Sequence, residues 1–138
     1  MRRALAILAM VAFVVSAAYM YMEAFWAYDG KYLELQMRFI KGHAAKKMNG
    51  VLKVSGYLEK GKKAFSYKIW ISDEAYKDEL GPAVAYVKIA LDAEKYKAMG
   101  YDRMKVYLNF YPEGVEPTKR LRRWFILKFD GDCAGKAW

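Results

Sequence analysis

Residues 31–40 read KYLELQMRFI, and the regular alternation of apolar and polar side chains in this stretch decides the expected fold class. Every second position is apolar, which is the period of a β-strand with one buried and one exposed face. The apolar positions are Leu33, Leu35, Met37 and Phe39. We therefore predict an antiparallel sheet that places one face on a core.

The same alternation recurs at four more places along the chain. The stretches are VLKVSGYLE (51–59), AFSYKIWI (64–71), RMKVYLNFY (103–111) and TKRLRRWFILKFD (118–130). The segment EKGKK between the first two predicts a hairpin turn around Gly61. In the last stretch, Leu121, Phe125, Leu127, Phe129 and Arg123 share one face, and Arg120, Arg122, Trp124, Ile126 and Lys128 share the other.

Helical signals lie between the predicted strands at 64–71 and 103–111. Ser72 can cap a short helix, and Pro82 suits the first turn of a second one. Apolar residues at helical spacing then predict one long helix over 83–99, with Gly100 as its left-handed C-cap. An alternative comes from an alignment of 68–81 with 88–100: a true repeat would make 84–91 a strand.

The N-terminal segment predicts a membrane anchor. Residues 4–22 contain no charge, and 19 residues of helix span roughly 28 Å, close to the thickness of a bilayer's hydrocarbon core. Aromatic residues at its end favour the headgroup level. They are Tyr19, Tyr21, Phe25, Trp26 and Tyr28. A cleaved secretory signal is the alternative, and it would leave a secreted domain.

These patterns predict an α+β fold in two parts. Residues 1–28 would be the signal-anchor and residues 29–138 a single domain with the order β-β-β-α-β-β. Arg2 and Arg3 precede the apolar run and acidic residues follow it, which favours a cytoplasmic N-terminus and a domain outside the cell.

Composition narrows the function. The net charge is +9, which indicates an anionic partner. The single histidine, His43, and the single cysteine, Cys133, supply neither a catalytic set nor a metal site, and the phosphate-binding glycine motifs are absent. We therefore expect no enzyme activity, no cofactor and no metal. Few amides among many charges are typical of a thermophile's protein.

The candidate contact residues begin the last strand. They are Lys119, Arg120, Arg122, Arg123 and Trp124. The sequence predicts a membrane-anchored extracytoplasmic accessory domain, inserted through residues 4–22, that binds lipid headgroups, a surface polymer or an acidic subunit and that could form oligomers. Nucleic-acid binding at the membrane is the alternative, because arginine beside aromatic rings can neutralise phosphate and stack bases.

Overall fold

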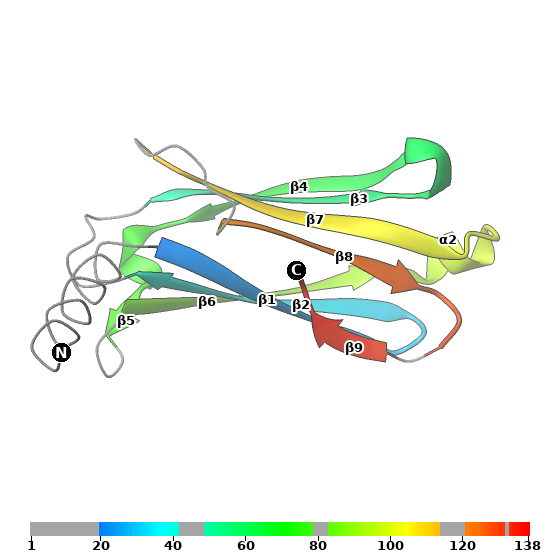
Figure 1. The fold of residues 1–138 in the computed structure, drawn as a ribbon, viewed down its shortest axis with the longest axis horizontal. Coiled ribbons are helices and arrows are strands. Elements are labelled where there is room, and N and C mark those ends of the chain that lie inside the picture. Colours follow the sequence, from blue (N-terminus) through cyan, green and yellow to red (C-terminus); the bar gives the residue numbers. More distant parts are fainter. Residues whose placement is uncertain (1–19, 42–48, 79–82, 114–120, 132) are drawn as a thin grey trace, which may run out of the picture.

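Two antiparallel sheets face each other across one core in the computed structural model, which describes residues 20–41, 49–78, 83–113, 121–131 and 133–138 (Figure 1). The five-stranded sheet has the order β5-β6-β2-β1-β9 and the four-stranded sheet has the order β4-β3-β7-β8. The architecture is a β-sandwich, in which alternate residues of each strand fill the space between the sheets.

The bounds of the elements follow from the backbone hydrogen bonds. The five-stranded sheet contains β1 (Met20–Tyr28), β2 (Tyr32–Lys41), β5 (Lys77–Asp78), β6 (Ala83–Asp92) and β9 (Cys133–Lys136). The four-stranded sheet contains β3 (Gly50–Tyr57), β4 (Lys63–Ile71), β7 (Arg103–Pro112) and β8 (Arg122–Lys128). Between strands of the described chain lie the short helical turns η1 (Glu59–Gly61), η2 (Asp73–Ala75) and α2 (Glu94–Ala98).

Aromatic contacts between the two sheets organise the core. The rings of Phe39 and Phe110 lie 4.9 Å apart, and those of Trp26 and Phe125 stack at the same separation, with an interplanar angle of 6°. Each pair joins a strand of one sheet to a strand of the other. Aromatic side chains bury large apolar areas, so these pairs hold the sheets together.

The C-terminal segment joins the sheets along one side of the sandwich. The backbone N–H of Trp138 donates to the carbonyl oxygen of Trp124 in β8 at 2.9 Å, and the N–H of Trp124 donates back at 3.2 Å. Ala137 N–H donates to Ala24 O in β1 at 2.8 Å. These bonds satisfy backbone groups of β8 that an open edge would leave unpaired.

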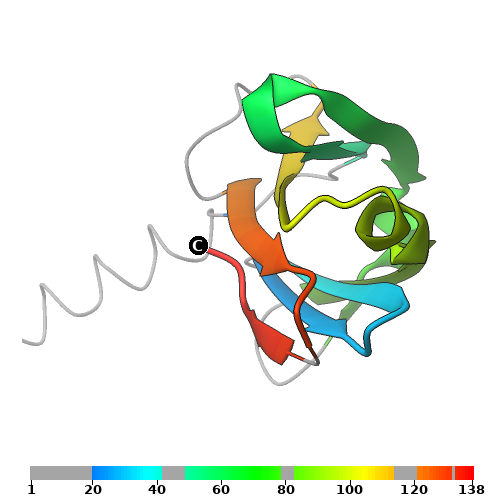
Figure 2. The same cartoon turned by 90° about the vertical axis from the view of Figure 1, so that its right-hand side faces the viewer.

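Helix α2 lies at one end of the sandwich, near the other open side between β4 and β6 (Figure 2). Tyr96 is buried, and its hydroxyl donates to Ala64 O in β4 at 3.1 Å. Ala93 N–H donates to Lys31 O at 2.9 Å. The helix is therefore attached to both sheets.

Much of the strand pattern is confirmed. The alternating stretches at 31–40, 51–59, 64–71, 103–111 and 118–130 overlap with β2, β3, β4, β7 and β8, in that order. In β8 the predicted inner and outer faces are confirmed. Phe125 and Leu127 are buried, while Arg122, Trp124 and Ile126 are exposed. Gly100 has the predicted positive φ, +91°.

The predicted α+β fold and its β-β-β-α-β-β order are wrong. Residues 83–92 form strand β6, and only five residues of helix follow as α2. Val87 and Leu91 fit a helix period, but they also fit the strand period of Ala85 and Ile89. All ten residues of β6 pair with β2, and this long-range pairing selects the strand. The repeat alternative, which makes 84–91 a strand, describes this segment correctly.

The helix predicted after Ser72 is also wrong beyond its first turn. The Ser72 hydroxyl does accept a hydrogen bond from Glu74 N–H at 3.2 Å, as a cap would. Only the three residues of η2 follow before the chain enters β5. The capping signal is therefore local, and the chain returns to extended backbone to reach the five-stranded sheet.

The predicted membrane helix, and the localisation inferred from it, are also contradicted by the structure. Residues 20–28 are not the end of a helix but strand β1, between β2 and β9. Tyr28 is buried and Trp26 stacks in the core, so these rings do not form a headgroup belt; Phe25 and Tyr21 lie on the outer face. Across the part of the chain that the structure describes, no helix is long and apolar enough to cross a bilayer. Tyr19 and the rest of the predicted span lie outside the described residues.

Candidate anion-binding face

The charges of the two sheets are distributed very differently. The strands of the four-stranded sheet carry eight basic residues and no acidic one. The strands of the five-stranded sheet carry five basic and four acidic residues. The excess positive charge of the described chain is therefore concentrated on one sheet, a distribution that attracts anions to that side.

The outward positions of the four-stranded sheet form what we call the basic face. Leu52, Leu108 and Leu127 point into the core and are fully buried, so the residues that alternate with them point away from it. The basic residues on this outer side are Lys53, Lys63, Lys68, Arg103, Lys105, Arg122 and Lys128. The aromatic residues there are Tyr57, Trp70, Tyr107, Tyr111 and Trp124.

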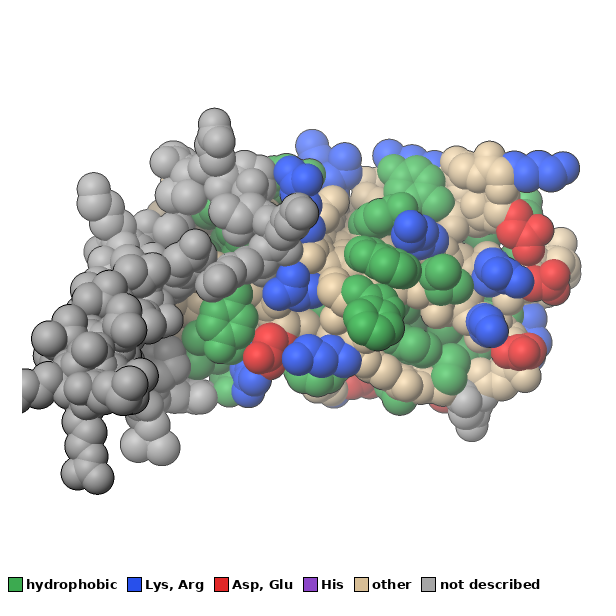
Figure 3. Space-filling model, viewed as in Figure 1, with side chains coloured by type: hydrophobic (Ala, Val, Ile, Leu, Met, Phe, Trp, Pro, Cys, Tyr) green, Lys and Arg blue, Asp and Glu red, His purple; other side chains and the backbone are tan. Residues whose placement is uncertain are grey.

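Strand register arranges these side chains in rows that cross the sheet. Lys68, Lys53, Asn109 and Arg122 are successive cross-strand partners and form one row. Ser66, Ser55, Tyr107 and Trp124 form the next. Figure 3 shows lysine, arginine and hydrophobic side chains interleaved along the upper half of the molecule, with acidic ones mainly at the right-hand end.

Like charges meet directly within this arrangement. Lys53 lies opposite Lys68 and Arg103 lies opposite Lys128. Facing like charges destabilise a sheet. Among the residues that the structure describes, none of the basic side chains of this face has an acidic partner within ion-pair distance. The folded protein therefore holds positive charges that an external anion would stabilise.

Several charges of the other sheet are paired with one another. Arg38 on β2 donates a hydrogen bond to Glu23 on β1, and Lys88 Nζ on β6 lies 3.0 Å from Glu34 Oε1 on β2. The hydrogen bond that Arg38 donates to the Glu23 carboxylate raises the pKa of Arg38. The basic face therefore has more unpaired positive charge than the outer face of the five-stranded sheet. Substitutions on the five-stranded sheet can serve as controls in binding experiments.

A cluster of side chains lies at the centre of the basic face. Lys105 Nζ lies 4.6 Å from the ring centroid of Trp124 and 5.1 Å from that of Tyr107. Tyr57 meets Tyr107 edge to face at 5.7 Å. Such cation–π and aromatic contacts order the rings in the free protein.

An open depression of about 640 Å³ lies beside this cluster. Residues of β3 and β7 and the η1 turn line it: Lys53, Ser55, Tyr57, Leu58, Gly61, Lys105, Tyr107, Asn109 and Tyr111. Its lining combines ammonium groups, hydroxyls, an amide and three tyrosine rings, without a carboxylate. This chemistry suits an anionic ligand that also has flat or apolar parts.

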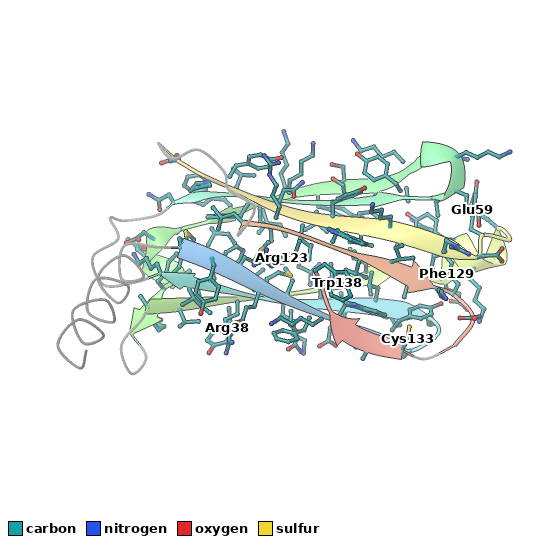
Figure 4. All side chains as sticks on the ribbon, in the orientation of Figure 1. Arg38, Glu59, Arg123, Phe129, Cys133 and Trp138 are labelled. Atoms are coloured by element: carbon teal, nitrogen blue, oxygen red, sulfur yellow. The ribbon has the colours of Figure 1, made fainter. Side chains whose placement is uncertain are left out.

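Only some of the predicted contact residues reach this face. Arg122 and Trp124 lie on it and are exposed. Arg123, labelled in Figure 4, is on the inward side of β8, opposite Leu108, and is half-buried. Burial lowers the pKa of Arg123, and the nearby Glu23 carboxylate opposes that change. Lys119 and Arg120 lie outside the described residues.

Sequence reasoning missed most of the face. The missed residues are 15 or more positions from Arg122 in the chain, and no local basic run marks them as the run at 119–123 marks Arg122. They are Lys53, Lys68, Lys105, Tyr57 and Tyr107. A signal for them existed: the segments that form β3, β4, β7 and β8 have basic or aromatic outer positions and no acid. What could not be read was that these four strands are neighbours in one sheet.

Metal-binding clusters are not found among the residues that the structure describes. No group of three or more His, Cys, Asp or Glu residues there could hold a metal ion. Cys133, in β9, is half-buried, and His43 lies outside the described residues. The basic face is the candidate site that the described residues offer.

Comparison with known proteins adds no relative: no family model, no curated protein and no solved structure matches this chain.

Proposed function

We propose that this protein is a non-enzymatic binding module whose basic face holds an extended anionic polymer. The observation that carries the proposal is the charge asymmetry, with eight basic residues and no acid on four adjacent strands. A polymer with repeated negative groups can satisfy several of these side chains at once, and the flat sheet offers contacts in a row.

Matched charge-neutral variants of the full chain test the proposal. Labelled heparin and labelled inorganic polyphosphate serve as probes at low salt, and fluorescence anisotropy reports binding. The double variant Lys53→Gln with Arg122→Gln removes two charges from the basic face. The double variant Lys88→Gln with Lys136→Gln removes two charges from the five-stranded sheet.

The basic-face variant should bind roughly tenfold or more weakly, since each Lys or Arg near an anionic surface contributes about 1 kcal/mol. The control variant should change affinity less than about threefold, because its charges lie on the opposite side. Equal losses in both variants, or no binding of either probe by the unchanged protein, would contradict the proposal.

A further inference from the structure

The side chains of the basic face indicate which class of anionic polymer it binds. This inference rests on the proposed function. Five aromatic side chains share the face with the basic ones, and Trp70, Tyr111 and Trp124 are each more than a third exposed. Exposing large rings to water is unfavourable without a partner. A ligand made only of charged groups would leave these rings without a role.

The rings and the charges alternate along the strands. On β7, Lys105, Tyr107, Asn109 and Tyr111 point outward in succession, and on β8 so do Arg122, Trp124, Ile126 and Lys128. Successive outward positions are about 6.7 Å apart along a strand. Rows of positive charge therefore lie next to rows of aromatic surface, at a separation comparable to one residue of a polymer.

We propose that the polymer is a single-stranded nucleic acid. Its phosphates would lie against Lys53, Lys105 and Arg122, and its bases would stack on Tyr107 and Trp124. Proteins that bind single strands combine a positive track for the backbone with aromatic platforms for the bases, and both are present here on one sheet.

Lys105 links the two parts of this site. Its ammonium group already lies over the Tyr107 and Trp124 rings, so it would place positive charge beside a base stacked there. Asn109, between Lys53 and Arg122 in its row, offers an amide to a base edge. Stacking is available to every base, so only a modest sequence preference is expected.

A duplex fits the face less well. Paired bases hide their flat surfaces inside the helix, so the aromatic rings could not stack on them. A duplex would therefore use the basic residues alone. The inference requires that a single strand binds more tightly than a duplex of the same sequence.

The experiment compares four probes on the full chain: an oligo(dT) strand, an abasic deoxyribose-phosphate strand of equal length, a duplex, and heparin. The abasic strand carries the same phosphates without bases. We expect oligo(dT) to bind at least tenfold more tightly than the abasic strand. The affinity for oligo(dT) should fall with salt, with a slope of roughly −0.7 for each phosphate contacted.

Variants then locate the stacking. Trp124→Ala and Tyr107→Ala should each weaken oligo(dT) binding roughly 5- to 150-fold and leave abasic-strand binding nearly unchanged. Trp124→Phe keeps a ring and should recover most of the loss. Phe25→Ala is the matched control, because Phe25 is an exposed ring on the outer face of the five-stranded sheet. Thermal unfolding of each variant checks that it remains folded.

The outcomes separate this inference from the proposed function. Equal affinities for oligo(dT) and the abasic strand would overturn the inference and leave a general polyanion site. Tighter binding of heparin than of oligo(dT) would overturn it in favour of an acidic glycan. Failure of all four probes to bind at low salt would overturn the proposed function as well.

Discussion

The ammonium group of Lys105 lies within 5.1 Å of two ring centroids, those of Tyr107 on its own strand and Trp124 on the neighbouring strand. One lysine thus orders two rings of the basic face and supplies positive charge beside them. Replacing Lys105 should therefore affect both stability and binding.

Lys105→Met keeps most of the length of the side chain and removes its charge. We expect a loss of roughly 0.5–2 kcal/mol in the free energy of unfolding, from two cation–π contacts at a partly exposed site. Affinity for anionic polymers should also fall. Urea unfolding and polyanion titration measure the two effects. Lys95→Met removes a cation–π contact on α2 instead, and it should leave binding nearly unchanged.

Lys68→Glu should stabilise the free protein while it weakens anion binding. The change turns the facing pair Lys53–Lys68 from repulsive to attractive, which is worth roughly 0.2–1 kcal/mol in a sheet. Thermal unfolding without ligand gives the stability, and titration gives the affinity. Lys88→Glu is the opposite control. It places a second carboxylate beside that of Glu34, and it should lower the stability of the free protein. A less stable Lys68→Glu protein would show that the pair is not repulsive.

Phe125→Ala should destabilise the fold by about 3–5 kcal/mol, because Phe125 is buried and stacks on Trp26 across the two sheets. Ile126→Ala, one residue later on the exposed face, should cost less than about 1 kcal/mol. Chemical denaturation of both variants measures the difference. Similar losses in the two would contradict the assignment of inner and outer faces to β8.

Gly50→Ala should destabilise by about 1–3 kcal/mol through steric overlap. A β-carbon at Gly50 would lie 2.6 Å from the Phe110 ring and 2.6 Å from the carbonyl oxygen of Tyr111. Gly131→Ala is the matched control, since nothing lies within 4 Å of a β-carbon there. The comparison of midpoints in urea tests this packing, and equal midpoints would argue against it.

The β1–β2 turn should weaken in acid. The Asp29 carboxylate accepts hydrogen bonds from the backbone N–H groups of Tyr32 and Lys31, and these bonds lower its pKa in the folded protein. The stabilisation is therefore complete above the pKa of the unfolded chain, near 4, and is lost as the pH falls through the lower folded value. Asp29→Asn should be less stable than the unchanged protein at pH 7, and the gap should narrow below pH 4. Melting temperatures at several pH values measure it, and a constant gap would contradict the assignment.

The local sequence pattern was sufficient to predict a strand wherever apolar and polar residues alternated without a competing helical period. Leu33, Leu35, Met37 and Phe39 alternate with polar residues and allow only a strand with one buried face. Segments with two possible periods were not decided locally. Val84 to Leu91 fits a helix and a strand equally, and ten residues of pairing with β2 made it a strand. Residues 1–28 suggested a membrane anchor, yet the last nine of them, 20–28, pair with β2 as β1.

The sequence by itself determined most strands, which of their faces is buried, and the excess of positive charge, because these depend on side-chain order along a short stretch. Only the tertiary structure decided which strands are neighbours, and therefore where that charge collects. Lys53, Lys105 and Arg122 come from three separated strands, and they share a face because β3, β7 and β8 are adjacent in one sheet. Strand pairing is a long-range interaction whose free energy depends on the whole core, so no local pattern contains it.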